Sequence, residues 1–130
     1  MKQFLFLLII YATYSDQRAA EEKVIGTWTV IEIMTTEKMP NDIYEQRTFG
    51  LIEPIKISFK PNFIATATKN NGELISDLDW KINMKKIEIH YNGEDLFLNE
   101  FNDKFGMKFS GKRKLKLVSE NNKTIFLERD

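Results

Sequence analysis

Short runs of alternating apolar and polar residues make up most of this 130-residue chain, and turn-forming residues separate them. In the clearest run, Ile55, Ile57 and Phe59 alternate with polar residues, as in a strand that buries one face. Turn signals such as the Asn-Asn-Gly of 70–72 recur at intervals of about 8–12 residues. The pattern predicts about nine strands, at residues 24–33, 55–60, 63–68, 74–82, 86–91, 96–101, 105–110, 114–118 and 124–129.

Short links between consecutive strands favour an antiparallel up-and-down β-barrel over a Greek-key sandwich, which needs long crossover connections. Closing the sheet also removes the unpaired edge strands that a long meander exposes. We therefore expect an all-β barrel of about 8–9 strands, whose interior holds side chains or one small ligand.

The first run changes its apolar parity part-way along. Trp28 and Val30 share one parity, whereas Ile31 and Ile33 share the other. This predicts a long first strand that bends and changes the side it turns toward the core. Gly26 has no Cβ, so the backbone can turn tightly there or let a large ring lie close by.

Gly26-Thr27-Trp28 resembles the Gly-x-Trp signature that opens the lipocalin barrel, and Arg129 lies late in the last run, as in that family. The resemblance is to small bacterial lipocalin-like domains and covers residues 24–129. It implies that Trp28 closes one barrel end, with Arg129 packed over its indole by a cation–π contact. It also implies that the long connection 36–53, which we expect to be a loop, folds over the open end as a lid.

The start of the chain predicts export. Lys2 precedes a short apolar run, residues 4–11, and Thr13 and Ser15 suit cleavage before residue 16. The run is too short to span a bilayer; the alternative is a buried strand or helix of the domain. We expect a signal peptide at 1–15, a short helical or mobile segment at 16–23, a lipocalin-like domain at 24–130, and a periplasmic or secreted protein.

Composition argues against several functions. The 19 basic and 19 acidic residues give a formal charge of zero, so nothing favours binding to nucleic acid or to a charged membrane. The chain has no Cys, and its one His, His90, lies on a polar parity. Asp77, Asp79 and the basic run 112–116 also fit the outer faces of strands. We therefore expect no metal, no cofactor and no enzymatic activity.

The inward face of the barrel is the remaining candidate site. Ala65, Ala67 and Ser76 are small residues on neighbouring strands, so a cavity should open beside them unless larger neighbours fill the space. The predicted ligand-binding residues are Phe63, Ala65, Ala67, Ser76, Leu78, Trp80, Phe105 and Met107.

Two functions fit these expectations. The first is an exported carrier that holds a small apolar ligand inside the barrel. The second is an exported protein-binding module, such as an inhibitor or an adaptor for an envelope protein, with a filled barrel. In both cases we expect a monomer without a membrane span.

Overall fold

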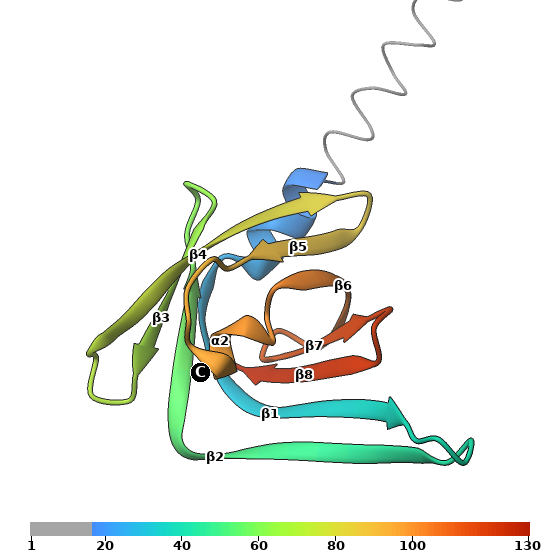
Figure 1. Cartoon of the computed structure of the whole chain (residues 1–130). Helices are drawn as coiled ribbons and strands as arrows, with labels where there is room; N and C mark the ends of the chain where they lie inside the picture. Colours follow the sequence, from blue (N-terminus) through green and yellow to red (C-terminus); the bar gives the residue numbers. More distant parts are fainter. Residues whose placement is uncertain (1–16) are drawn as a thin grey trace, which may run out of the picture.

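A computed structural model describes residues 17–130, with only the backbone of residues 37, 38 and 49–53. The predicted signal peptide lies outside the described residues. Eight antiparallel strands form a closed barrel in sequential order (Figure 1), which confirms the predicted fold class. The strands are β1 (Gly26–Lys38), β2 (Tyr44–Phe59), β3 (Ile64–Lys69), β4 (Leu74–Asn83), β5 (Lys86–His90), β6 (Asp103–Ser110), β7 (Lys114–Ser119) and β8 (Lys123–Glu128).

The bend predicted in β1 is present. Val30 pairs with Leu127 of β8, but Glu32 pairs with Phe126, so Ile31 is an extra residue in the ladder. Trp28 and Val30 are buried before this bulge and Ile33 is buried after it, while Ile31 is exposed. One inserted residue moves the following side chains to the opposite face, which explains the change of parity.

The predicted strand at 96–101 is wrong. Residues Leu96–Asn99 form a short helix, α2, and the Asp95 side chain accepts a hydrogen bond from the backbone N–H of Leu98 at its start. Leu98 and Phe101 lie about one helical turn apart, and both are fully buried. The segment 91–102, which contains α2, connects β5 to β6.

The predicted loop at 36–53 is also wrong, because strands occupy most of it. β1 continues to Lys38, and β2 begins at Tyr44 after a turn in which the Met39 N–H donates to the Ile43 carbonyl. β1 pairs with β8 only as far as Thr35. Residues 36–46, here called the arm, therefore extend as a two-stranded ribbon beyond β8 (Figure 1).

The corner of β2 lies where the arm sheet joins the barrel. Val30 of β1 pairs with Ile55 and Glu32 pairs with Gly50, so one residue of β1 faces the four residues 51–54. Such an irregularity bends a strand sharply. From Ile55 onward β2 pairs with β3 as well as with β1, whereas residues 44–50 pair with β1 alone.

Both barrel ends carry additional segments (Figure 1). Strand connections alternate between the ends, so α2 lies at the same end as the β1–β2 turn, and the helical residues 17–24 lie at the other. Val24 from the first segment and Leu98 and Phe101 from the second belong to the same buried cluster as the barrel interior. The core therefore extends without interruption from one end to the other.

Candidate functional site

Trp28 and Arg129 meet at the end covered by residues 17–24. The Arg129 guanidinium carbon lies 4.3 Å from the Trp28 ring centroid, and its Nη1 and Nε donate to the carbonyls of Ile25 and Lys112 at 3.2 and 2.8 Å. The Trp28 Nε1–H donates to the Val24 carbonyl at 2.8 Å. The contact expected from the lipocalin resemblance is therefore present, and it fixes the N-terminal segment across this end.

Gly26 makes this arrangement possible. Its backbone φ of 137° lies in a region that residues other than glycine rarely adopt. A Cβ there would also lie only 3.2 Å from the Arg129 Nη1. The glycine of the Gly-x-Trp sequence thus leaves room for the guanidinium that covers the tryptophan.

The structure places most of the predicted ligand-binding residues inside the barrel. Ala65, Ala67, Leu78, Trp80 and Phe105 are buried. Ala65 pairs with Leu78 and Ala67 with Ser76 across β3 and β4, so the small residues do lie together. Ser76 and Met107 are only partly buried.

Phe63 does not occupy the predicted inward position on a strand. It precedes β3, has a φ of 63°, and leaves 44% of its surface exposed. Its ring lies 5.3 Å from that of Trp80. Phe63 therefore belongs to the β2–β3 turn, where it covers Trp80 from the barrel end.

The space beside the small residues is occupied by neighbouring side chains. A side chain that lines a water-sized cavity has surface accessible to that cavity, yet Ala65 and Ala67 are 0% exposed. Large neighbours such as Ile57 and Phe59 are almost fully buried as well. The interior around the predicted site is thus packed as a core.

Trp80 is the one polar anomaly in this packed region. Among the described residues, its Nε1 is the only buried side-chain nitrogen or oxygen without a hydrogen-bond partner. The Phe59 ring lies nearly perpendicular to the indole, at an interplanar angle of 83° and a centroid distance of 5.5 Å. An unpartnered buried donor is costly unless an acceptor or the face of a ring compensates it.

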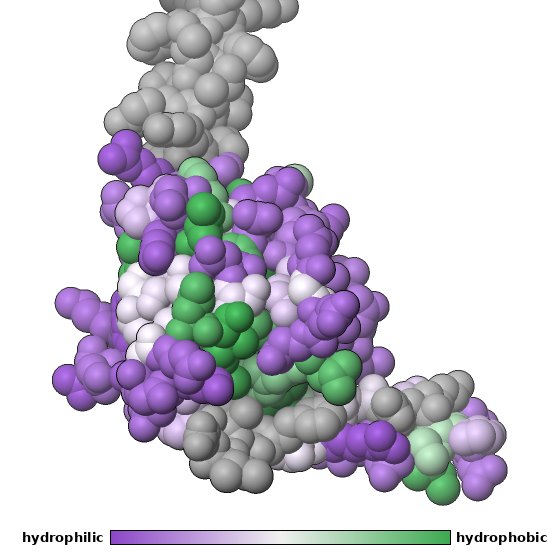
Figure 2. Space-filling model, turned by 60° about the vertical axis from the view of Figure 1, so that its left-hand side comes forward, coloured by the Kyte–Doolittle hydropathy of each residue, from purple (hydrophilic) through white to green (hydrophobic). Residues whose placement is uncertain are grey.

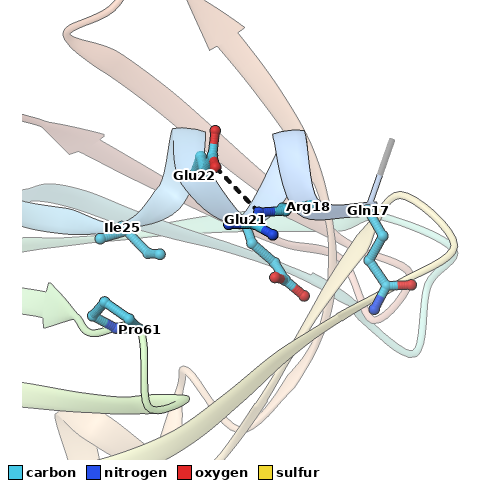
Figure 3. Close-up of a pocket in the computed structure, with 6 residues that line it drawn as sticks. All are labelled: Gln17, Arg18, Glu21, Glu22, Ile25 and Pro61. Atoms are coloured by element: carbon cyan, nitrogen blue, oxygen red, sulfur yellow. Dashed lines mark ion pairs between the residues drawn. The ribbon is translucent and has the colours of Figure 1, made fainter. Parts of the chain in front are cut away.

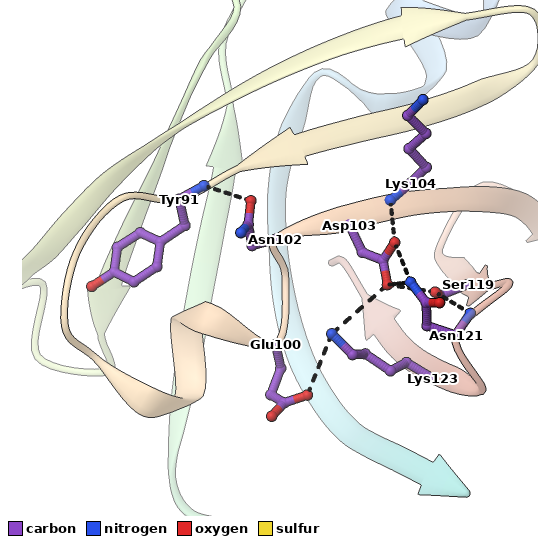
Figure 4. A network of polar contacts seen from close by, with 8 residues as sticks. All are labelled: Tyr91, Glu100, Asn102, Asp103, Lys104, Ser119, Asn121 and Lys123. Carbon is purple, nitrogen blue, oxygen red and sulfur yellow. Dashed lines mark hydrogen bonds and ion pairs between the residues drawn. The ribbon is translucent and has the colours of Figure 1, made fainter.

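A polar network lies at the α2 end of the barrel (Figure 4). The Asp103 carboxylate accepts hydrogen bonds from Ser119 Oγ at 2.6 Å and from Asn121 Nδ2 at 3.0 Å. The Lys123 Nζ lies 3.7 Å from both Asp103 and Glu100. The network therefore connects β6, the β7–β8 turn and the residue after α2.

Two opposing effects set the pKa of Asp103. Burial raises the pKa, but hydrogen bonds from Ser119, Asn121 and the Lys104 backbone N–H, together with the charge of Lys123, outweigh burial and lower it. The carboxylate is therefore ionised at neutral pH, where it attracts Lys123, whose Nζ also lies 3.7 Å from Glu100 at the end of α2.

The surface hollows offer little for chemistry. One of about 350 Å³ lies between the helical residues 17–24 and the β2–β3 turn (Figure 3), and is lined by Gln17, Arg18, Glu21, Glu22, Ile25 and Pro61. Arg18 and Glu22 form an exposed ion pair within it.

In the described part of the chain, no group of three or more His, Cys, Asp or Glu side chains is arranged to hold a metal ion. No helix among residues 17–130 is long and apolar enough to cross a membrane.

The arm was missed by the sequence analysis, and it carries exposed apolar side chains. Ile43 and Tyr44 are 61% and 64% exposed, and Met39 is also exposed. In Figure 2 hydrophobic atoms lie at the end of the projection at the lower right, away from the body of the barrel. On its outer side, β2 has an unpaired edge over residues 44–50, because β3 pairs only with residues 55–59.

Comparisons with known proteins support the fold alone. No protein-family model matches the chain, and no curated protein is significantly similar to it. Among solved structures, the chain is similar to "NMR structure of the protein from Burkholderia xenovorans", with a TM-score of 0.54 and 13% sequence identity over 86% of this chain and 87% of that chain. At 13% identity, the similarity shows that the two backbones follow a similar path, and it assigns no activity to this chain.

Proposed function

We propose that this protein is an exported, lipocalin-like β-barrel that binds another protein through its arm. The observation that carries the proposal is the contrast between a buried interior and an arm that exposes Ile43 and Tyr44. An isolated two-stranded ribbon is marginally stable in water. Contact with a partner would bury these side chains and give the ribbon a further neighbour.

Packing of the interior supports this function over ligand transport. Val24 is fully buried at one end, and Leu98 and Phe101 are fully buried at the other. A small ligand would have to displace such side chains, which costs the burial energy of each one, about 1.5–3 kcal/mol.

Export rests on the sequence of residues 1–15, and the lipocalin-like assignment rests on Gly26, Trp28 and Arg129.

Site-specific photo-crosslinking in the source organism tests the working surface. The photoreactive amino acid p-benzoylphenylalanine replaces Tyr44 on the arm in one variant. In a matched control it replaces Met84, which is 88% exposed in the turn between β4 and β5 at the other end of the barrel. We expect a protein adduct from position 44 and none from position 84. No adduct from position 44, or equal adducts from both positions, would contradict the proposal.

A second candidate function is the carrier of a small apolar ligand, and the unpartnered Trp80 Nε1–H favours it. A ligand with a hydrogen-bond acceptor would satisfy this donor. Titration with an apolar fluorescent probe tests it: stoichiometric binding to the folded protein, lost in Ala67→Phe, supports the carrier. No binding by the parent protein rejects it.

A further inference from the structure

The free edge of β2 is suited to a second copy of this chain. We infer that two copies pair antiparallel along residues 44–48 of β2, so that their arms form one four-stranded sheet. The inference rests on the proposed function, because it names the partner of the arm. It replaces the monomer that the sequence analysis leads us to expect.

The backbone geometry leaves the required groups free. Thr36 pairs with Gln46 across the β1–β2 ladder, but the Thr36 N–H donates to Asn122 on the opposite side of β1. Gln46 is therefore in a non-hydrogen-bonded pair of that ladder, and its own N–H and carbonyl point away from β1. By the period of two along a strand, the same holds for Tyr44 and Thr48.

Charge selects the register of this pairing. A two-fold axis at Gln46 places Glu45 opposite Arg47 of the second copy, and Arg47 opposite Glu45. A two-fold axis at Glu45 instead places Glu45 opposite Glu45 of the second copy. A two-fold axis at Arg47 places Arg47 opposite Arg47 of the second copy. Opposite charges directly across an antiparallel pair are favourable and like charges are not. Of these three registers, only the one centred on Gln46 is electrostatically self-complementary.

Both side chains are about half exposed at the surface. Glu45 and Arg47 lie 3.9 Å apart within one chain, with side-chain exposures of 47% and 53%. Charged residues on an edge usually discourage pairing with other strands. Here the order of the two signs makes the strand's own copy a matching partner. Removal of residues 1–15 takes away Lys2 and leaves 18 basic and 19 acidic residues, a formal charge of −1, so net repulsion between two mature chains is small.

The arm also makes the approach of two barrels sterically simple. On the side of β2 away from β1, β3 pairs only with residues 55–59, so it does not occupy the edge of residues 44–48. Pairing would leave each barrel's own ladders unchanged.

A charge-swap experiment on the mature protein tests the inference. Sedimentation velocity and native mass spectrometry measure the dimer for the parent chain, for E45R and for R47E. Each variant places two like-charge pairs across the axis. We therefore expect the dissociation constant of its dimer to be at least about tenfold higher than that of the parent dimer. In an equimolar mixture, the two arginines of the E45R chain face the two glutamates of the R47E chain, and we expect a heterodimer to form.

Cysteine crosslinking tests the register. The chain has no native Cys, and hydrogen-bonded antiparallel pairs have Cα atoms about 5.5 Å apart, within disulfide range. We expect Q46C to form a disulfide-linked dimer under mild oxidation, whereas the exposed control M84C does not.

A parent chain that remains monomeric at about 100 µM, together with no heterodimer in the mixture, would overturn the inference. If the Tyr44 position then crosslinks to a different protein, the arm is still the binding surface and only the second copy is excluded. If it crosslinks to nothing, the proposed function fails as well.

Discussion

Ala67→Phe measures directly whether the barrel interior is filled. Ala67 lies on β3 between Ile57 of β2 and Ser76 of β4, and it is 0% exposed. Phenylalanine adds six carbon atoms where neighbouring side chains leave no accessible space. Overpacking of this kind costs about 1–3 kcal/mol or more. In a domain of this size that corresponds to a fall in Tm of about 5–15 °C.

The assay is thermal unfolding of the parent and the variant, followed by circular dichroism. Thr68→Phe is the matched control, because Thr68 is the next residue on the same strand, belongs to the outward parity, and is only partly buried. We expect the control to change stability by about 0.5 kcal/mol or less. An unchanged Tm for Ala67→Phe would show that a void adjoins Ala67, and the filled-barrel account would then be wrong.

Three further predictions concern the two covered ends of the barrel. In urea unfolding, Trp28→Ala should lower the free energy of unfolding by about 3–5 kcal/mol, and Arg129→Ala should lower it by about 1–2 kcal/mol. If neither substitution lowers the free energy of unfolding measurably, the contact between the two side chains does not stabilise the fold. Gly93→Ala should cost about 1–3 kcal/mol in the same assay, because a Cβ at that position would overlap the Tyr91 ring; parent-like stability would show that the connection adjusts easily. Asp103→Asn should destabilise the protein at pH 7, since hydrogen bonds outweigh burial and lower the pKa of Asp103 in the folded state. The difference from the parent should shrink as the pH falls below the unfolded value of about 3.9 toward the lower folded value, and a difference that does not vary with pH would contradict this reasoning.

Alternation identified the barrel because most strands bury one face and expose the other. The change of parity at Ile31 could also be predicted from the sequence, because a bulge shifts every later side chain by one position. The resemblance to lipocalins supplied the Trp28–Arg129 contact, which joins residues from the two ends of the chain. Nothing in the local pattern of either segment would have paired them.

The segment 96–101 was misassigned because a short apolar run does not distinguish a buried strand from a buried helix. The useful signal was Asp95 followed by Leu98 and Phe101, a helix cap and two apolar residues about one turn apart. Phe63 was misplaced for a related reason. It shares a parity with Ala65, yet the turn includes it, and its positive φ breaks the alternation.

The arm could not be predicted from hydrophobic periodicity, because apolar and polar residues alternate only where one face of a strand is buried. Residues 39–48 are exposed. Pro40 and Gly50 indicated a loop, but Pro40 lies in the turn that joins the strands and Gly50 lies next to the corner of β2. The β-branched residues Thr35, Thr36 and Thr48 were the available sign of strands.

Native mass spectrometry of the protein purified from its own host tests most directly whether this barrel acts as a filled protein-binding module. The account predicts an assembly that contains protein partners only, at twice the mass of the mature chain, and that dissociates in E45R. A monomer that carries a small molecule in one-to-one stoichiometry would contradict it.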